Sequence, residues 1–240
     1  MGVPDWQKGI VTRIEQATHN TRRYWIQMPA TNDFIFKPGQ FVTLDLPIHE
    51  QKNKRWRSYS IASAPDGTNI IELVIVWLDR GAGTTYLFND IKEGSELTLR
   101  GPQGVFTLHD DIDKDIFMIC TGTGIAPFRS MVNHIKNNNL QHKKLHLIFG
   151  TRKKEDLLYE TEMRQLMNEM PNFTYHPVLS REQVEGYKNG YVHTVYEELC
   201  TVAPPADFML CGWKMMVDEA KQRLLNLGYD KKSIHLELYG

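Results

Sequence analysis

The stretch ICTGTGIAPFRSM, residues 119–131, decides the fold. An apolar strand is expected to end at Cys120, glycines follow at positions 122 and 124, and a helix should begin near Ala126 with Pro127 in its first turn. Proline suits that turn because its missing N–H would have no partner within the helix. Glycines let backbone amides approach a ligand, and free amides at a helix N-terminus favour an anion. The stretch therefore predicts a site for phosphate or pyrophosphate.

The same stretch departs from two known nucleotide-binding patterns. It lacks the third glycine of the dinucleotide fingerprint and the lysine of the P-loop. A dinucleotide fold usually places a carboxylate for the ribose about 20 residues further on. This chain instead has Thr151, Arg152 and Lys153 after its next apolar run. A tight connection without a ligand remains the alternative, so other residues must decide.

Residues 1–110 carry a β pattern. Short runs such as KGIVTRIEQAT and IIELVIVWL alternate apolar with polar residues and are separated by turn sequences. This spacing predicts an antiparallel Greek-key barrel, with one helix near residues 84–91.

Residues 111–240 carry a different pattern. Apolar runs such as DIFMIC and LHLIFG alternate with helical stretches. We expect these helices to begin near Ala126, Lys154, Val192 and Trp213. The alternation predicts a doubly wound parallel sheet covered on both faces. The polar stretch HDDIDKD is the expected junction of the two domains.

Composition excludes several classes of function. The chain of 240 residues has 28 Lys and Arg against 29 Asp and Glu, which gives no global field for nucleic acid or an anionic membrane. No apolar run approaches the roughly 20 residues of a membrane span, and the N-terminus lacks a signal-peptide core. The three cysteines Cys120, Cys200 and Cys211 suit no disulfide framework or metal cluster. We expect a cytoplasmic monomer without a metal.

The barrel supplies a second motif, RWRSYSIASAP. Arg57 and Tyr59 should share one face of a strand, while Ser60 points to the other. An arginine for phosphate, an aromatic ring for stacking and a hydroxyl beside them indicate a flavin nucleotide site. An ordinary half-buried strand is the alternative.

Seven motifs in order resemble the ferredoxin-NADP reductase superfamily over nearly the whole chain, without a fused iron-sulfur domain. They are KPGQFV, RSYS, GAGT, GPQGVF, TGTGIAPFRS, CGWKMM and the terminal ELY. The resemblance implies a flavin-binding barrel, residues 1–110, followed by an NAD(P)-binding domain, residues 111–240, with FAD between them.

The resemblance also implies which barrel residues bind FAD. They are Arg57, Tyr59, Ser60, Val74, Ile75, Val76, Gly83 and Thr84. Arg57 would pair with the pyrophosphate, Tyr59 would pack on the flavin, and Ser60 would hydrogen-bond near flavin N5. Gly83 and Thr84 would open the short helix that receives the pyrophosphate.

In the second domain, the resemblance implies a nicotinamide nucleotide site. Its residues would be Thr121, Gly122, Thr123, Gly124, Cys211, Gly212 and Met216. Cys211 would face the nicotinamide, with a buried structural thiol as the alternative. Tyr239 would cover the flavin face that nicotinamide must occupy, and Glu237 would lie near the reaction centre. Gly240 follows the tyrosine and departs from the family ending, so an edge-strand tyrosine remains the alternative.

The choice of nucleotide depends on the 2′-phosphate. Ser180 and Arg181 resemble the pair that binds this phosphate in the NADP-dependent branch, with Lys188 and Tyr191 as further contacts. The segments GTRKKEDLLY and GYV also resemble NADH-dependent oxygenase reductases. We expect NADPH, with NADH as the alternative.

The resemblance implies an FAD-dependent reductase. A hydride would pass from NADPH to flavin N5, and electrons would leave singly to ferredoxin, flavodoxin or an oxygenase component. A reductase of free flavin or ferric chelates is one alternative, and an FAD-binding electron-transfer or regulatory subunit is another.

Overall fold

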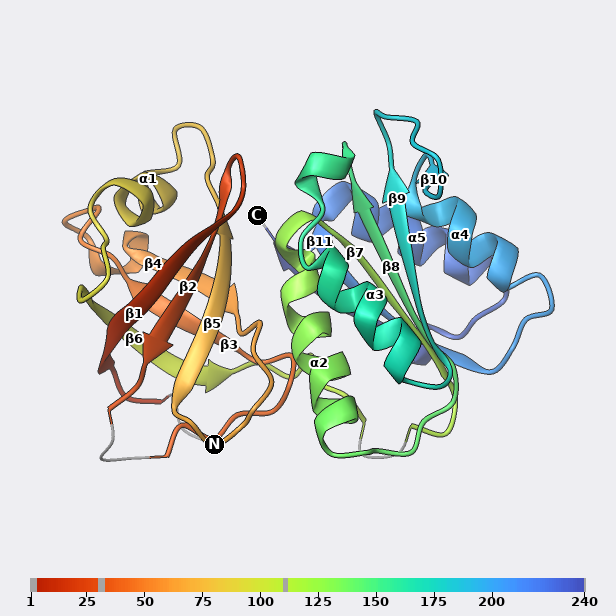
Figure 1. The fold of residues 1–240 in the computed structure, drawn as a ribbon, viewed down its shortest axis with the longest axis horizontal. Coiled ribbons are helices and arrows are strands. Elements are labelled where there is room, and N and C mark those ends of the chain that lie inside the picture. The colour runs from red at the N-terminus through yellow and green to blue at the C-terminus, as the bar shows by residue number, and fades with distance from the viewer. Residues whose placement is uncertain (1–3, 30–32, 110–111, 240) are drawn as a thin grey trace. The chain divides into compact units, whose positions relative to one another are not determined.

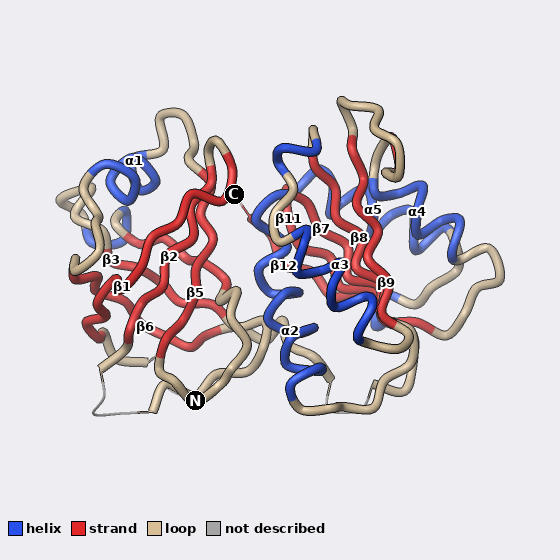
Figure 2. Tube along the Cα trace, viewed as in Figure 1, coloured by secondary structure: helices blue, strands red, loops and turns tan. Residues whose placement is uncertain are grey.

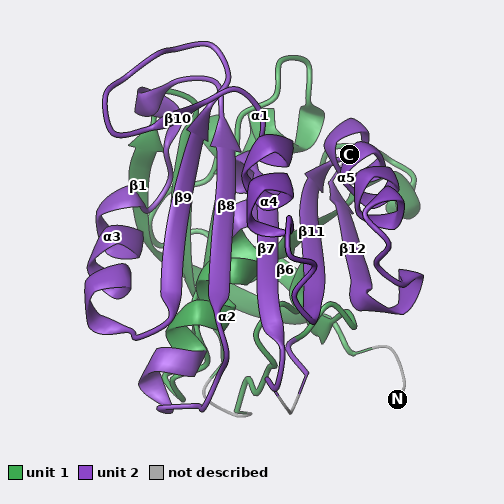
Figure 3. Cartoon of the chain, turned by 90° about the vertical axis from the view of Figure 1, so that its right-hand side faces the viewer, with its two compact units in different colours: residues 1–107, 126–134 green, residues 108–125, 135–240 purple. Residues whose placement is uncertain are grey.

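The computed structural model describes residues 4–29, 33–109 and 112–239. The chain divides into two compact units (Figure 3). Unit 1 comprises Met1–Thr107 and Ala126–His134, and unit 2 comprises Leu108–Ile125 and Ile135–Gly240. The predicted boundary between residues 110 and 111 lies outside the described residues.

Unit 1 is built on an antiparallel sheet of six strands. The strands are β1 (Gln7–Thr18), β2 (Thr21–Gln27), β3 (Phe41–Asp45), β4 (Trp56–Ser60), β5 (Ile70–Val76) and β6 (Glu96–Gln103). Their order is β4-β3-β6-β1-β2-β5, and a bridge between Ile61 and Leu73 joins the two edges (Figure 1). The predicted antiparallel barrel is confirmed.

Alternation along the strands explains the core of unit 1. On β2, Tyr24 and Ile26 are fully buried and Trp25 between them is only partly buried, as a strand with one apolar face requires. The predicted helix is α1 (Ala82–Asn89), whose Leu87 lies in the same core. The Tyr24 hydroxyl donates to the Leu87 carbonyl at 3.0 Å, which satisfies the one polar atom of this buried ring.

A buried ion cluster links three elements of unit 1. Glu72 on β5 is 2% exposed, and Arg23 on β2 donates to its two carboxylate oxygens at 2.6 and 3.2 Å. Arg129, on helix α2 (Ile125–Asn137), donates to Glu72 Oε2 at 2.8 Å and to the Ala62 carbonyl at 2.9 Å. A buried carboxylate needs such partners because burial alone disfavours its charge.

Unit 2 is built on a parallel sheet. Its strands are β7 (Asp115–Thr121), β8 (Leu145–Thr151), β9 (Phe173–Leu179), β10 (Lys188–Asn189), β11 (Ala206–Trp213) and β12 (Ile234–Tyr239). The order is β10-β9-β8-β7-β11-β12 (Figure 3), so the chain first winds outward from β7 and then returns to its other side. Figure 2 shows the strands of this sheet in red. The topological switch point therefore lies between the carboxyl ends of β7 and β11. The predicted doubly wound sheet is confirmed.

The helices of unit 2 follow the strands. Helices α4 (Val192–Leu199) and α5 (Lys214–Asn226) bury apolar side chains in one core on one face of the sheet. Helix α3 (Glu160–Glu169) begins six residues later than the expected start at Lys154. Residues Lys154–Asp156 form a single 3-10 turn instead, and Tyr159 has a φ of 57°. A right-handed helix cannot continue through such a left-handed residue, which explains the late start.

Candidate flavin and nucleotide sites

The side chain of Arg57 lies against the first turn of helix α1 in unit 1. The Arg57 guanidinium donates to the carbonyls of Lys54 and Trp56 at 3.1 and 2.8 Å. A Cβ on Gly83 would lie 3.1 Å from Arg57 Cγ, so the arginine stem lies against the first turn of α1. Gly81 is the N-cap and offers no side chain to the helix amides. A cation beside uncapped amides is suited to a phosphate group.

Tyr59 and Ser60 follow Arg57 on β4. Tyr59 is partly buried against the barrel core, and Ser60 is 5% exposed. Burial raises the pKa of Tyr59 far above its usual range, and the nearby Arg57 charge opposes this shift. The phenol is therefore neutral at physiological pH.

The edge of β5 offers backbone groups to a ligand. The Trp77 N–H donates to the Asn20 carbonyl at 2.7 Å beside β2. The backbone N–H and C=O groups of odd-numbered residues in β5 therefore point toward β2, and those of even-numbered residues point to the other edge. At that other edge, the Glu72 carbonyl accepts a hydrogen bond at 2.8 Å from the Ala62 N–H, in the segment after β4. Beyond that point, no strand among the described residues pairs with this edge of β5. The backbone groups of Val74 and Val76 therefore face an open edge.

The switch point of unit 2 gathers the glycine loop and the end of β11. A Cβ on Gly124 would overlap the Cys211 carbonyl, so the two backbones are in direct contact. Gly212 has a φ of 148°, and a Cβ there would lie 2.5 Å from Thr121 Oγ1 and 3.1 Å from Met216 Cε. Thr121 Oγ1 is buried and has no hydrogen-bond partner among the described residues. An unsatisfied buried hydroxyl of this kind is suited to a bound polar ligand.

Cys211, Glu237 and Tyr239 lie together on neighbouring strands. Cys211 on β11 is paired in register with Glu237 on β12, and its Sγ lies 3.8 Å from Glu237 Oε2. Burial raises the pKa of the Cys211 thiol, the Glu237 charge raises it further, and a hydrogen bond with Tyr239 partly offsets the shift. The thiol is thus protonated at neutral pH.

Ser180 and Arg181 meet the end of the neighbouring strand. Strands β8 and β9 end in register, with Thr151 opposite Leu179. Ser180 donates through N–H and Oγ to the Thr151 carbonyl at 3.0 and 3.1 Å, and the Arg181 N–H donates to the Arg152 carbonyl at 2.9 Å. Both arginines are exposed, and neither guanidinium has a partner among the residues that the structure describes.

Arg152 was not among the expected site residues, although a signal for it existed. It follows the end of β8 directly, just as Ser180 and Arg181 follow the end of β9. Parallel strands that are neighbours bring such ends to the same edge of the sheet. The expected contact Lys188 is engaged elsewhere, because its Nζ bonds the two Glu198 carboxylate oxygens at 2.8 and 2.6 Å. Tyr191, the N-cap of α4, is 70% exposed.

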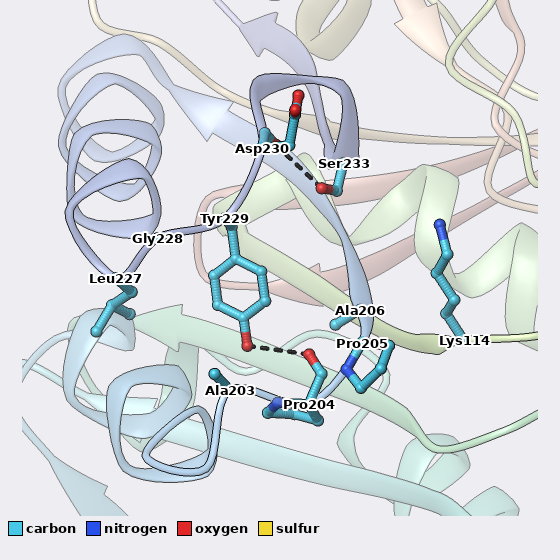
Figure 4. A pocket seen from close by; sticks show the side chains of 10 residues that line it. All are labelled: Lys114, Ala203, Pro204, Pro205, Ala206, Leu227, Gly228, Tyr229, Asp230 and Ser233. Carbon is cyan, nitrogen blue, oxygen red and sulfur yellow. Dashed lines mark hydrogen bonds between the residues drawn. The ribbon is translucent and has the colours of Figure 1, made fainter.

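A separate hollow of about 320 Å³ lies at the opposite edge of the sheet (Figure 4). It is lined by Lys114, residues 203–206, residues 227–230 and Ser233, which flank the amino ends of β7, β11 and β12. The Tyr229 hydroxyl donates to the Pro204 carbonyl there at 3.2 Å. Ligands of open parallel sheets bind at the carboxyl ends, so this hollow is not the expected nucleotide site.

Known protein families match both units. A family model described as an oxidoreductase FAD-binding domain matches residues 8–108, and one described as an oxidoreductase NAD-binding domain matches residues 118–222. Among the described residues, no helix is both long and apolar enough to cross a membrane.

Two curated relatives and one solved structure illustrate the similarity. Ferredoxin--NADP reductase B of Sorangium cellulosum is 33% identical over 215 residues, which cover 86% of each chain. The glycine betaine monooxygenase reductase subunit of Pseudomonas aeruginosa is 29% identical over 95% of this chain but only 63% of its own length. A ferredoxin NADP+ reductase from Neisseria gonorrhoeae with bound FAD and NADP is 25% identical, with a TM-score of 0.82 over 97% of this chain and 98% of that one.

The order of the two matched domains, FAD-binding first and NAD-binding second, agrees with the order of the two units. The chain belongs to the ferredoxin-NADP reductase family of flavin oxidoreductases.

Proposed function

We propose that this protein oxidises NADPH and passes the electrons singly to a protein acceptor. The observation that carries the choice of NADPH is a pair of exposed arginines at adjoining strand ends, Arg152 and Arg181, whose guanidinium groups have no partner among the described residues. A hydrogen bond to a charged group contributes about 1.5–3 kcal/mol, so each arginine could favour NADPH over NADH about tenfold to a hundredfold. The three residues that follow β8 directly are Arg152, Lys153 and Lys154, so none of them offers a carboxylate to the 2′-hydroxyl of NADH.

Unit 1 fits FAD. Arg57 and the first turn of α1, with Gly83 and Thr84, would hold the pyrophosphate, because a cation and uncapped helix amides meet there. The open edge of β5 would hydrogen-bond the flavin through the backbone of Val74 and Val76, with Ile75 between them. Tyr59 would pack on the flavin as a neutral ring, and Ser60 would donate to it.

Unit 2 fits the nicotinamide nucleotide. The unsatisfied Thr121 hydroxyl and the glycine backbones at the switch point would hold the nicotinamide end. Residues 180–181 lie two strands away, which is about 10 Å at the usual strand spacing. This separation suits a ligand that extends along the carboxyl edge of the sheet, with its 2′-phosphate at Arg181.

The bound cofactors supply the redox chemistry, in which a hydride passes from nicotinamide C4 to flavin N5 and electrons leave singly. The protein residues would orient the rings and exclude water. Cys211 would contact the nicotinamide as a neutral thiol, because burial and Glu237 hold its proton in place. Glu237 would carry a negative charge near the reaction centre, and Tyr239 would cover the flavin until nicotinamide displaces it.

The acceptor would be a ferredoxin-like protein or an oxygenase component. The Sorangium relative is named for ferredoxin, and the Pseudomonas relative is named as a subunit of a monooxygenase. An oxygenase component is the second candidate because several relatives named for oxygenase systems match 88–97% of this chain. Oxidation of the reduced protein by each candidate acceptor in a stopped-flow instrument would distinguish them.

The test begins with purified protein. We expect it to be yellow and to bleach faster with NADPH than with NADH under anaerobic conditions. Arg181→Ala and Arg152→Ala should each raise the KM for NADPH about tenfold or more and leave the KM for NADH unchanged. Lys153→Ala is the matched control, because it removes a neighbouring positive charge that is paired with Glu155 at 3.2 Å. Equal rates with both nucleotides, or a colourless protein that binds no FAD, would contradict the proposal.

A further inference from the structure

Residues 180–190, which include the two-residue strand β10, form a mostly exposed segment between β9 and α4 that we call the specificity loop (Figure 1). It begins with Ser180 and Arg181, the residues proposed to bind the 2′-phosphate. The Gly190 N–H donates to the Leu179 carbonyl at 2.9 Å. The loop therefore returns to the strand end from which it left.

Both ends of the specificity loop are held by polar contacts. Near its start, the carboxylate of Glu182 accepts a bond from the Lys154 N–H at 2.7 Å. Near its end, the Asn189 side chain donates to the carbonyls of Leu179 and Glu182 at 3.3 and 3.0 Å. These bonds fix the two ends. The outer turn, residues 183–187, is closed by a hydrogen bond from the Tyr187 N–H to the Val184 carbonyl at 3.2 Å.

The side chain of Tyr187 connects this outer turn to helix α3. Its hydroxyl donates to Glu160 Oε1 at 2.5 Å, and Arg164 Nε donates to the same oxygen at 2.8 Å. The Arg164 guanidinium lies 5.2 Å from the Tyr187 ring centre, and Lys154 Nζ lies 5.4 Å from it. In the described part of the chain, Tyr187 is the only side chain of residues 183–187 that bonds to α3.

The cluster is well suited to hold a loop in one conformation. Glu160 is the first residue of α3 and Arg164 follows one turn later, so the helix itself fixes both partners of Tyr187. Hydrogen bonds to a carboxylate are stronger than bonds between neutral groups. A binding loop that is ordered before the ligand arrives loses less entropy on binding, and affinity rises accordingly.

We propose that Tyr187, bonded to Glu160, is a positioning residue that holds Ser180 and Arg181 in place for a 2′-phosphate and so sets the preference for NADPH over NADH. The inference rests on the proposed function of the specificity loop. Tyr187 does not itself touch the phosphate in this proposal; it acts through the loop backbone.

The experiment uses Tyr187→Phe and Glu160→Gln in the FAD-loaded protein, with a melting curve for each. Both substitutions preserve size and remove only the hydroxyl or the charge. Tyr229→Phe is the matched control, because it removes a tyrosine hydroxyl bonded to a backbone carbonyl at the opposite edge of the same sheet. KM and kcat are measured for NADPH and NADH with ferricyanide as acceptor, and calorimetry measures binding of adenosine 2′,5′-bisphosphate and of 5′-AMP.

We expect Tyr187→Phe and Glu160→Gln each to raise the KM for NADPH and the Kd for the bisphosphate about fivefold to tenfold. The kcat, the KM for NADH and the Kd for 5′-AMP should stay at the wild-type values. The double variant should lose no more than Tyr187→Phe alone, because Glu160→Gln weakens the same bond that Tyr187→Phe removes.

Wild-type binding of both nucleotides in the two variants would overturn the inference alone, and so would equal losses for both nucleotides. A wild-type protein that shows no preference for NADPH or for the bisphosphate would instead overturn the proposed function, and the inference with it.

Discussion

Replacing Glu72 with glutamine should destabilise unit 1 more than the substitution of a surface carboxylate would. The side chain of Glu72 is 2% exposed, and those of its partners Arg129 and Arg23 are 13% and 24% exposed. Removing one partner of a buried ion pair typically costs about 3–5 kcal/mol. Arg23 also bonds Glu15 at 3.2 Å, which retains part of its compensation. We therefore expect a loss of about 2–3 kcal/mol in the free energy of unfolding.

A loss of this size lowers the melting temperature by about 5–10 °C in a protein of this length. Thermal unfolding followed by circular dichroism measures it, and Glu96→Gln serves as the control. Glu96 pairs with Lys8 at 2.8 Å, but both side chains are exposed, so that substitution should change the melting temperature by less than about 2 °C. If both variants melt within 2 °C of the wild type, the buried cluster contributes no net stability and our reasoning is wrong.

Three further predictions concern the cofactor sites and the response to pH. Gly83→Val should lower FAD affinity at least about tenfold, because the valine side chain would meet the Arg57 stem at 3.1 Å or less. Fluorescence titration with FAD measures this affinity, and a wild-type value would contradict the prediction. A chain that ends at Leu238 should show altered affinity for NADPH and NADH, and unchanged values for both would remove the role assigned to Tyr239. Burial, with a smaller effect of His146, lowers the pKa of His176 from 6.5 to about 4, so the unfolded chain binds a proton below pH 6.5 that the folded protein does not. The contribution of His176 to the free energy of unfolding should be constant above pH 6.5 and should fall by up to about 1.4 kcal/mol per pH unit between pH 6.5 and pH 4. Urea unfolding at pH 7 and pH 5 should therefore show a smaller change in this free energy for His176→Gln than for the wild type.

Local sequence patterns predicted the elements that depend on neighbouring residues. The alternation of apolar and polar residues in KGIVTRIEQAT, residues 8–18, predicted the barrel strand β1, and Pro127 after the two glycines predicted the start of α2. The start of α3 was wrong because Tyr159 adopts a left-handed conformation, which no pattern in the residues around it indicates.

Sequence motifs predicted the parts of the candidate site that lie within one segment. The parts formed where two distant segments meet were harder to predict. Arg57 and the glycine loop each belong to one motif. Arg152 and Arg181 are 29 positions apart, and only the pairing of β8 with β9 brings their backbones into contact. Lys188 has the right charge for a phosphate contact, but it bonds Glu198, which lies near the C-terminal end of α4, ten positions further along the chain.

The two ends of the nucleotide site differ in how freely they can change. At the switch point, Gly124 and Gly212 leave no room for a Cβ, so the main chain itself shapes the reacting end and almost any substitution there is excluded. At Arg152 and Arg181 the side chains are exposed and replaceable. If these arginines bind the 2′-phosphate as proposed, coenzyme preference can change through substitutions at a few exposed positions while the backbone geometry at the switch point stays the same.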